Sequence, residues 1–124
     1  MTSQGVGKPF KKEEKIMAYH ACELRGSAYL TPYKKDLEVL TNISNGDSAT
    51  FRYIESKENF KDIDIKANGS GFIEIFMNNI KVGYVEIKNG RVLNKELGTN
   101  SGEYEMVLKF KESNKLELLE ITLY

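Results

Sequence analysis

The chain has 124 residues and a formal net charge of zero, because 18 Lys and Arg residues balance 18 Asp and Glu residues. That length fits a single domain with its own core. The charge balance argues against a nucleic-acid partner, since phosphate contacts need a basic excess. One Cys excludes an internal disulfide, one His excludes a His-rich zinc centre, and no stretch of about 20 apolar residues predicts a membrane span. There is no Trp, so only Tyr and Phe can offer aromatic surface to a ligand.

The first residues differ in composition from the rest of the chain. Residues 1–7 are rich in Ser, Gly and Gln, and they lack the apolar segment of a signal peptide. We therefore expect residues 1–8 to form a linker or an added tail, and residues 9–124 to form one folded domain.

From Pro9 onward, the pattern is that of short strands separated by turn residues. The stretch 11–20 is compatible with a short helix or with a first strand. Several later segments combine β-branched or aromatic content with period-two alternation: 49–54, 61–67, 73–77, 80–88, 91–97, 104–110 and 116–124. Many short strands at even spacing predict an all-β protein, specifically a β-sandwich of jelly-roll type.

Turn chemistry supports this division. Asn89-Gly90 is the strongest hairpin signal, and Asn78-Asn79 predicts a second tight turn because Asn tolerates a positive φ. Gly-, Asn- and Ser-rich clusters predict further turns, at 42–48, 67–71, 98–102 and 111–115.

Residues that could carry catalysis are few. His20 and Cys22 lie two apart, but neighbours on one strand rarely reach each other as a nucleophile and its base, so an ordinary His and a buried Cys are favoured. Asp62 and Asp64 alternate with apolar residues, which predicts a solvated sheet face rather than a hydrolase acid pair. No phosphate loop, metalloprotease motif or nucleophile elbow is present. We expect a protein that is not an enzyme.

Aromatic residues suggest binding instead. Seven Tyr and six Phe are more than a small core needs, and Tyr combines an apolar ring with a polar tip. Tyr29 and Tyr33 lie in the loop-like stretch 26–33, which is bounded by Gly and Pro. Two interpretations stay open here: both rings serve a ligand, or Tyr29 plugs the end of the sandwich and Tyr33 lies on the surface.

Five segments, in order, resemble family 6 carbohydrate-binding modules of the kind attached to family 43 glycoside hydrolases. They are the opening stretch 9–19, the Ile-x-Asn-Gly-Asp stretch 43–51, the Gly-rich strand entry 69–75, the strand 102–110 and the closing strand 116–124. The resemblance covers nearly the whole chain.

This resemblance implies a galactose-binding-like β-sandwich with a non-catalytic role. Its expected partners are a polysaccharide or oligosaccharide of the β-glycan type, such as xylan or arabinoxylan, and the catalytic domain of a parent xylosidase or arabinofuranosidase. No nucleic acid or membrane partner is expected. The alternative is a structural accessory domain of such an enzyme in which sugar binding is weakened or lost.

The resemblance also implies a sugar site in loops at one end of the sandwich, with two aromatic residues and two polar partners. Tyr33 is the nearest match for one aromatic residue, Tyr19 falls where many relatives carry Trp, and Glu23 and Asn114 match the polar partners loosely. The loop that usually supplies Trp corresponds to 88–92, which has no aromatic residue. This departure favours a weak binder.

A structural calcium, held by acids of the first and last strands, is the last feature that the resemblance implies. Glu13 and Glu120 match two of these acids, whereas Lys15 replaces another. We hypothesise that Lys15 pairs with Glu120 or Glu13 and that the calcium site is weakened or absent. The alternative is that Lys15 points into solvent.

Overall fold

A computed structural model describes residues 10–11, 13–33, 37–56, 60–93, 97–98 and 102–124. These residues form ten strands and one 3-10 turn, η1 (Ala18–His20). The strands are β1 (Phe10–Lys11), β2 (Lys15–Met17), β3 (Glu23–Arg25), β4 (Tyr29–Pro32), β5 (Glu38–Thr41), β6 (Ser48–Ser56), β7 (Ile63–Met77), β8 (Ile80–Lys88), β9 (Arg91–Leu93) and β10 (Gly102–Leu123). In this part of the chain no helix has the length and apolar character needed to cross a membrane.

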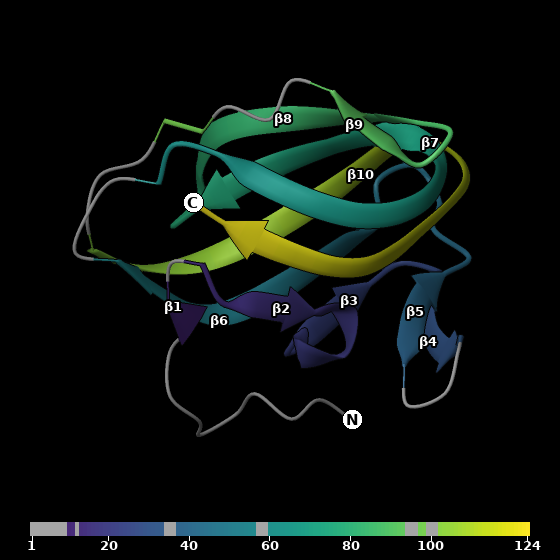
Figure 1. Ribbon diagram of the computed structural model, residues 1–124. Coiled ribbons are helices and arrows are strands. Elements are labelled where there is room, and N and C mark those ends of the chain that lie inside the picture. The colour runs from purple at the N-terminus through teal and green to yellow at the C-terminus, as the bar shows by residue number, and fades with distance from the viewer. Residues whose placement is uncertain (1–9, 12, 34–36, 57–59, 94–96, 99–101) are drawn as a thin grey trace.

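The strands are ordered β1-β6-β10-β7-β8-β9, with β2 and β5 pairing β10, β3 pairing β6, and β4 pairing β5. The long strands β7 and β10 pair along most of their length, and both curve so that the sheet folds over on itself (Figure 1). The all-β prediction is confirmed. The expected linker at 1–8 lies outside the described residues.

One core fills the space inside the folded sheet. The faces predicted from alternation are confirmed, because the alternate residues Ile63, Ile65 and Ala67, and likewise Met106, Leu108 and Phe110, are all buried. The largest fully buried side chains include Phe51, Phe60 and Phe110. Each contributes about 1.5–3 kcal/mol of hydrophobic stabilisation.

The predicted hairpins are also confirmed. Asn78 and Asn79 have φ values of 51° and 68° and join β7 to β8, while Asn89 and Gly90, at 51° and 77°, join β8 to β9. At the N-terminal side, the stretch 11–20 was expected to be a short helix or a first strand. It contains a short element of each kind, because the strand β2 leads directly into the 3-10 turn η1.

Two predicted turns are wrong. The clusters at 67–71 and 111–115 lie inside the continuous strands β7 and β10, where the pairing register shifts instead of ending. Gly69 in β7 and Glu112 and Lys115 in β10 have positive φ values, and both strands bend there. Because they bend at the same place, β7 and β10 stay paired with each other. Tyr29, expected in a loop, begins β4 and is 51% exposed, so it does not plug the end of the sandwich.

Candidate functional site

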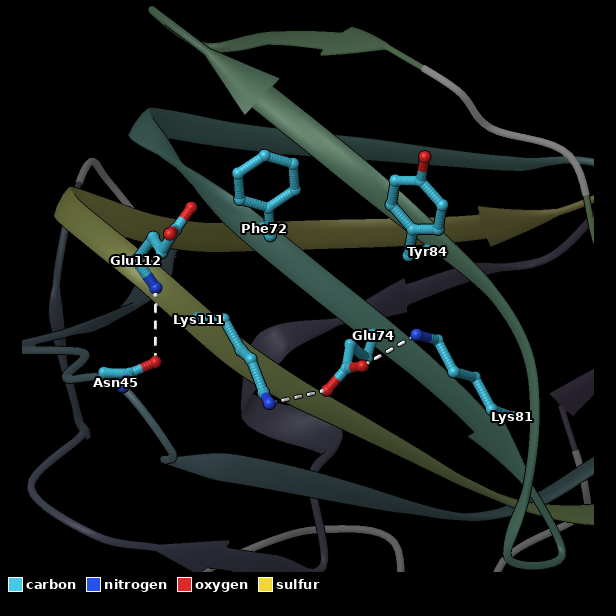
Figure 2. Close-up of a pocket in the computed structure, with 7 residues that line it drawn as sticks. All are labelled: Asn45, Phe72, Glu74, Lys81, Tyr84, Lys111 and Glu112. Atoms are coloured by element: carbon cyan, nitrogen blue, oxygen red, sulfur yellow. Dashed lines mark hydrogen bonds and ion pairs between the residues drawn. The ribbon is translucent and has the colours of Figure 1, made fainter.

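A groove of about 460 Å³ lies across β7, β8 and the bend of β10, on the sheet face that points away from the core (Figure 2). Phe72 and Glu74 face it because they alternate along β7 with the buried Ile73 and Ile75. Seven residues line this outer-face groove: Asn45, Phe72, Glu74, Lys81, Tyr84, Lys111 and Glu112.

Aromatic rings form one side of the outer-face groove. The ring centroids of Phe72 and Tyr84 lie 6.5 Å apart at an interplanar angle of 45°. Tyr84 is 46% exposed, and the Lys81 Nζ lies 5.7 Å from its ring centroid. The rings therefore present an accessible apolar surface next to a cation.

An ionised carboxylate forms the centre of the groove. Glu74 Oε2 accepts a hydrogen bond of 2.8 Å from Lys81 Nζ, and Glu74 Oε1 lies 3.4 Å from Lys111 Nζ. The hydrogen bond from Lys81 is the main reason that the pKa of Glu74 is lowered. At the rim, the backbone N–H of Glu112 donates to Asn45 Oδ1 over 3.3 Å. These contacts hold polar groups in fixed positions beside the rings.

A second groove, of about 350 Å³, contains the predicted site residue Tyr33. Leu37, Lys66, Asn68, Gly90 and Glu120 are among the residues that line it with Tyr33. Tyr33 is 39% exposed, and its backbone N–H donates to the carbonyl of Leu37. Glu120, expected at a metal site, therefore shares a groove with the expected aromatic platform.

A third groove, of about 470 Å³, lies where β4 and β5 meet the bend of β10. Tyr29, Asn42 and Glu117 line it with Thr41, Ile43, Lys115 and Leu116. The Glu117 carboxylate accepts hydrogen bonds from Thr41 Oγ1 over 2.8 Å and from Asn68 Nδ2 over 3.3 Å.

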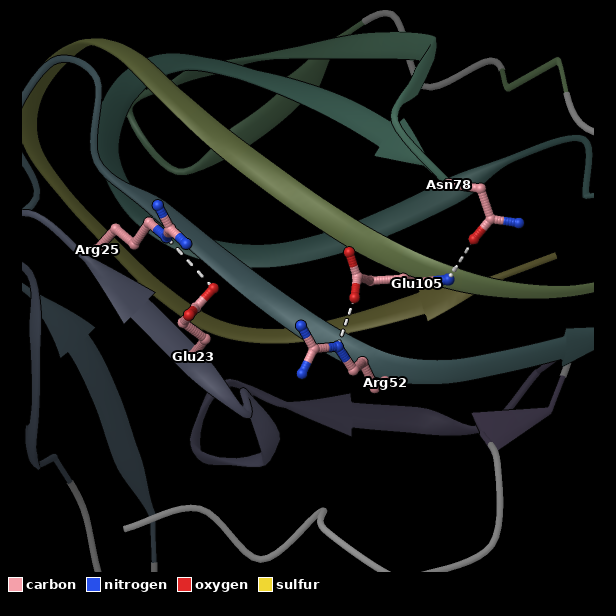
Figure 3. Close-up of polar contacts among 5 residues, drawn as sticks. All are labelled: Glu23, Arg25, Arg52, Asn78 and Glu105. Carbon is pink, nitrogen blue, oxygen red and sulfur yellow. Dashed lines mark hydrogen bonds and ion pairs between the residues drawn. The ribbon is translucent and has the colours of Figure 1, made fainter.

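The other predicted sugar-site residues lie elsewhere. The Tyr19 ring packs 4.5 Å from the His20 ring, Glu23 Oε1 pairs with Arg25 Nε at 3.3 Å (Figure 3), and Asn114 lies on β10 opposite Ser70. None of the three lines a groove described above.

The strand that carries Glu23 belongs to a different surface from the outer-face groove. Further along this surface, Arg52 pairs with Glu105, whose backbone N–H donates to Asn78 Oδ1 (Figure 3). Each of the five side chains drawn there has a polar partner within the protein.

His20 and Cys22 do not form a nucleophile pair on one strand. The Nδ1 atom of His20 accepts a hydrogen bond of 3.0 Å from the backbone N–H of Met17, and burial lowers the pKa of His20. Cys22 is half-buried in the stretch that follows η1. Of the two expected acids on a solvated sheet face, Asp64 is exposed and Asp62 is half-buried.

The residues that match calcium ligands do not fit that ion. Glu120 Oε1 lies 3.1 Å from the ammonium of Lys66, the residue opposite it on β7. Glu13 has a φ of 70° and donates its backbone N–H to Leu123. Lys15 is exposed and lies opposite Thr122, so the hypothesised partner of Glu120 is replaced by Lys66. Nowhere in the described residues do three or more His, Cys, Asp or Glu side chains gather as metal ligands.

The outer-face groove was not predicted from the sequence. Phe72, Phe76 and Tyr84 occupy the polar positions of alternating strands, and aromatic residues at such positions are the signal that was available. Which of these aromatic residues lie close together depends on the pairing of three strands. The sequence could therefore identify the residues but not the groove that they form.

The chain is a curled all-β fold whose outer-face groove is lined on one side by aromatic rings. No protein-family model and no curated protein sequence matches the chain. Solved structures confirm the predicted fold: it is that of family 6 carbohydrate-binding modules.

Three of these structures illustrate the similarity. A family 6 module from Clostridium stercorarium in complex with cellobiose has a TM-score of 0.81 and 13% identity, covering 95% of this chain and 98% of that chain. A β-1,3-glucan-binding family 6 module from Bacillus halodurans has a TM-score of 0.80 and 17% identity, covering 94% and 98%. An arabinoxylan arabinofuranohydrolase of glycoside hydrolase family 43 from Bacillus subtilis, in complex with cellotetraose, has a TM-score of 0.80 and 11% identity, covering 94% of this chain and 28% of that chain.

Proposed function

We propose that this chain is a non-catalytic glycan-binding module and that the outer-face groove holds the sugar. The observation that carries this proposal is the pairing, in one groove, of the Phe72 and Tyr84 rings with a carboxylate fixed by two lysines. Sugars need both kinds of surface, because their C–H faces are apolar and their edges carry hydroxyls.

Each group has a defined part in such binding. A sugar ring stacks on Tyr84, which is the more exposed of the two rings. Glu74 accepts hydrogen bonds from hydroxyls, and Lys81 and Lys111 donate to hydroxyl oxygens. Stacking on one ring contributes about 1–3 kcal/mol, by analogy with stacking on aromatic side chains elsewhere, so we expect weak to moderate affinity.

The similar structures support the ligand class. One is a complex with cellobiose, and another is described as binding β-1,3-glucan. A third is a glycoside hydrolase of which the matching region makes up 28%. We infer that the natural ligand is a β-glycan and that the module is joined to the catalytic domain of a glycoside hydrolase. Xylan and arabinoxylan are the first ligands to test.

The loop-end site built on Tyr33, with Tyr19, Glu23 and Asn114, is a second proposed location for the sugar. Tyr33 is supported by the groove that it lines. The other three residues rest on the sequence resemblance alone.

Affinity electrophoresis on xylan, arabinoxylan and β-1,3-glucan tests the proposal. We expect retardation on at least one of them, and we expect Tyr84→Ala to reduce affinity roughly 10-fold or more. Tyr53→Ala is the matched control, because Tyr53 is 49% exposed against 46% for Tyr84 and does not line the groove. Circular dichroism confirms that each variant is folded.

The outcomes separate the candidate sites and functions. Loss of binding in Tyr33→Ala but not in Tyr84→Ala would move the site to the Tyr33 groove. No retardation on any β-glycan would overturn glycan binding and favour the alternative, a structural accessory domain. The absence of Trp from the chain is the observation that keeps this alternative in view.

A further inference from the structure

The sheet face beside the outer-face groove carries one lysine more than Glu74 engages. Glu74 is already engaged by Lys81 and Lys111. A third lysine, Lys109, lies directly opposite Glu74 on β10. Two ammonium groups therefore contact the Glu74 carboxylate, and a third lysine is its neighbour across the sheet.

Glu74 pairs with Lys81 and Lys111 but not with Lys109. The Lys109 side chain is exposed, and its Nζ lies 5.6 Å from the ring centroid of Phe76. Within the part of the chain that the structure describes, no carboxylate pairs with Lys109. A positive charge thus lies over an aromatic ring, two positions along β7 from Glu74.

The other acids near this groove lie at its opposite end. Glu86 pairs with Phe72 across β7 and β8, and Glu112 lines the rim close to Asn45. Lys81 pairs with Phe76 across the same two strands. The two ends of this face therefore differ: Glu86 and Glu112 lie with Lys111 at the Phe72 end, whereas Lys81 and Lys109 lie at the Phe76 end.

We propose that the glycan held by this groove carries carboxylate groups, so that the ligand class is a β-glycan substituted with uronic acid. This inference rests on the proposed function. The uronate side group extends from the groove to Phe76, which lies beside the lining on β7, and its carboxylate is bound by Lys109 and Lys81. A neutral hydroxyl would offer these lysines only an ordinary hydrogen bond, whereas a carboxylate offers a charge-assisted one. The overall charge balance of the chain still argues against a nucleic acid as the polyanion.

Isothermal titration with two xylo-oligosaccharides of equal length tests this inference. One is unsubstituted and the other carries a single glucuronic acid side group. We expect the acidic ligand to bind about three- to tenfold more tightly, as two solvent-exposed ion pairs would allow. Raising the salt concentration to about 0.5 M should reduce this preference, because mobile ions screen exposed charges.

Lys109→Gln identifies the residue responsible. This variant should lose most of the preference for the acidic ligand while its affinity for the neutral one changes less than twofold. Lys61→Gln is the control, since Lys61 is an exposed lysine whose backbone bonds to Tyr124, away from the groove. It should keep the full preference.

The two levels of the hypothesis fail differently. Equal affinities for the two ligands, or an equal preference in wild type and Lys109→Gln, would overturn the acidic ligand class and leave glycan binding intact. No binding of either ligand would overturn the proposed function and this inference with it.

Discussion

Asp47 shows at the residue scale why a short motif can be structural rather than functional. It is 6% exposed, and its Oδ2 accepts hydrogen bonds from the backbone N–H groups of Ser27 and Ser44 and from the Ser27 hydroxyl. Burial alone would raise the pKa of Asp47, but these hydrogen bonds outweigh it and lower the pKa. A Cβ on Gly26 would lie 1.9 Å from Asp47 Oδ1, so this neighbour is restricted to glycine. The Asn-Gly-Asp motif thus joins two loops.

We predict that Asp47→Ala lowers the free energy of unfolding at neutral pH by about 1–3 kcal/mol, because it leaves buried donors without an acceptor. The lowered pKa means that the contribution of Asp47 is fully present above its ordinary pKa of 3.8. It is lost as the pH falls through the lower pKa of the folded protein. Urea unfolding of wild type and variant, at neutral pH and at about pH 2, measures this change.

Asp64→Ala provides the control for this experiment, because Asp64 is an exposed carboxylate on a sheet face. It should change the free energy of unfolding by less than about 0.5 kcal/mol at either pH. A loss in Asp47→Ala that stayed constant down to the lowest pH would contradict the assigned role of the charged carboxylate.

The bends of β7 and β10 show, at the element scale, where sequence reasoning stops. Hairpins at 78–79 and 89–90 could be predicted because two adjacent residues determine each turn. The glycine-rich stretch 67–71 looked like another turn, but β10 bends beside it and keeps the strand paired. The part of β10 that pairs with this stretch lies about 45 residues further along the chain. The residues of 67–71 themselves do not indicate that pairing. The outer-face groove was missed for the same reason, since its residues come from three strands and the loop that holds Asn45.

Gly69 permits this bend, and we predict that Gly69→Ala destabilises the protein more than its backbone angle explains. Gly69 has a φ of 80°, and an added Cβ would lie 2.1 Å from the carbonyl oxygen of Lys115. Gly46, with a φ of 93° and no atom within 4 Å of an added Cβ, is the matched control.

The comparison separates backbone strain from steric clash. Gly46→Ala should cost about 1–2 kcal/mol, the price of a left-handed residue, whereas Gly69→Ala should cost at least about 1–2 kcal/mol more. Thermal unfolding of the two variants measures the difference. Equal losses would mean that the two bent strands separate easily and that the close contact is not important.

At the scale of the whole molecule, the question is whether the fold needs a metal. One continuous core contains buried residues from β2 and η1 through to the end of β10, and a chain of this size can be stable on its core alone. The sequence could predict that core, because period-two alternation identifies the inward face of each strand. It could not predict which cation faces Glu120, because Lys66 lies 54 residues away in sequence and meets it only through β7–β10 pairing.

We therefore predict that stability does not depend on calcium. Lys66 already places a positive charge 3.1 Å from Glu120 Oε1, so a divalent ion would have to displace an ammonium and would find too few acids around it. The melting temperature should agree within about 1 °C in excess calcium and in excess chelator, since only a ligand of the folded state shifts it. Lys66→Gln should lower stability by less than about 1 kcal/mol, as exposed pairs do, while Lys66→Arg should retain it. A stoichiometric calcium heat with a rise in melting temperature would contradict the prediction and assign Glu13 and Glu120 to a metal site.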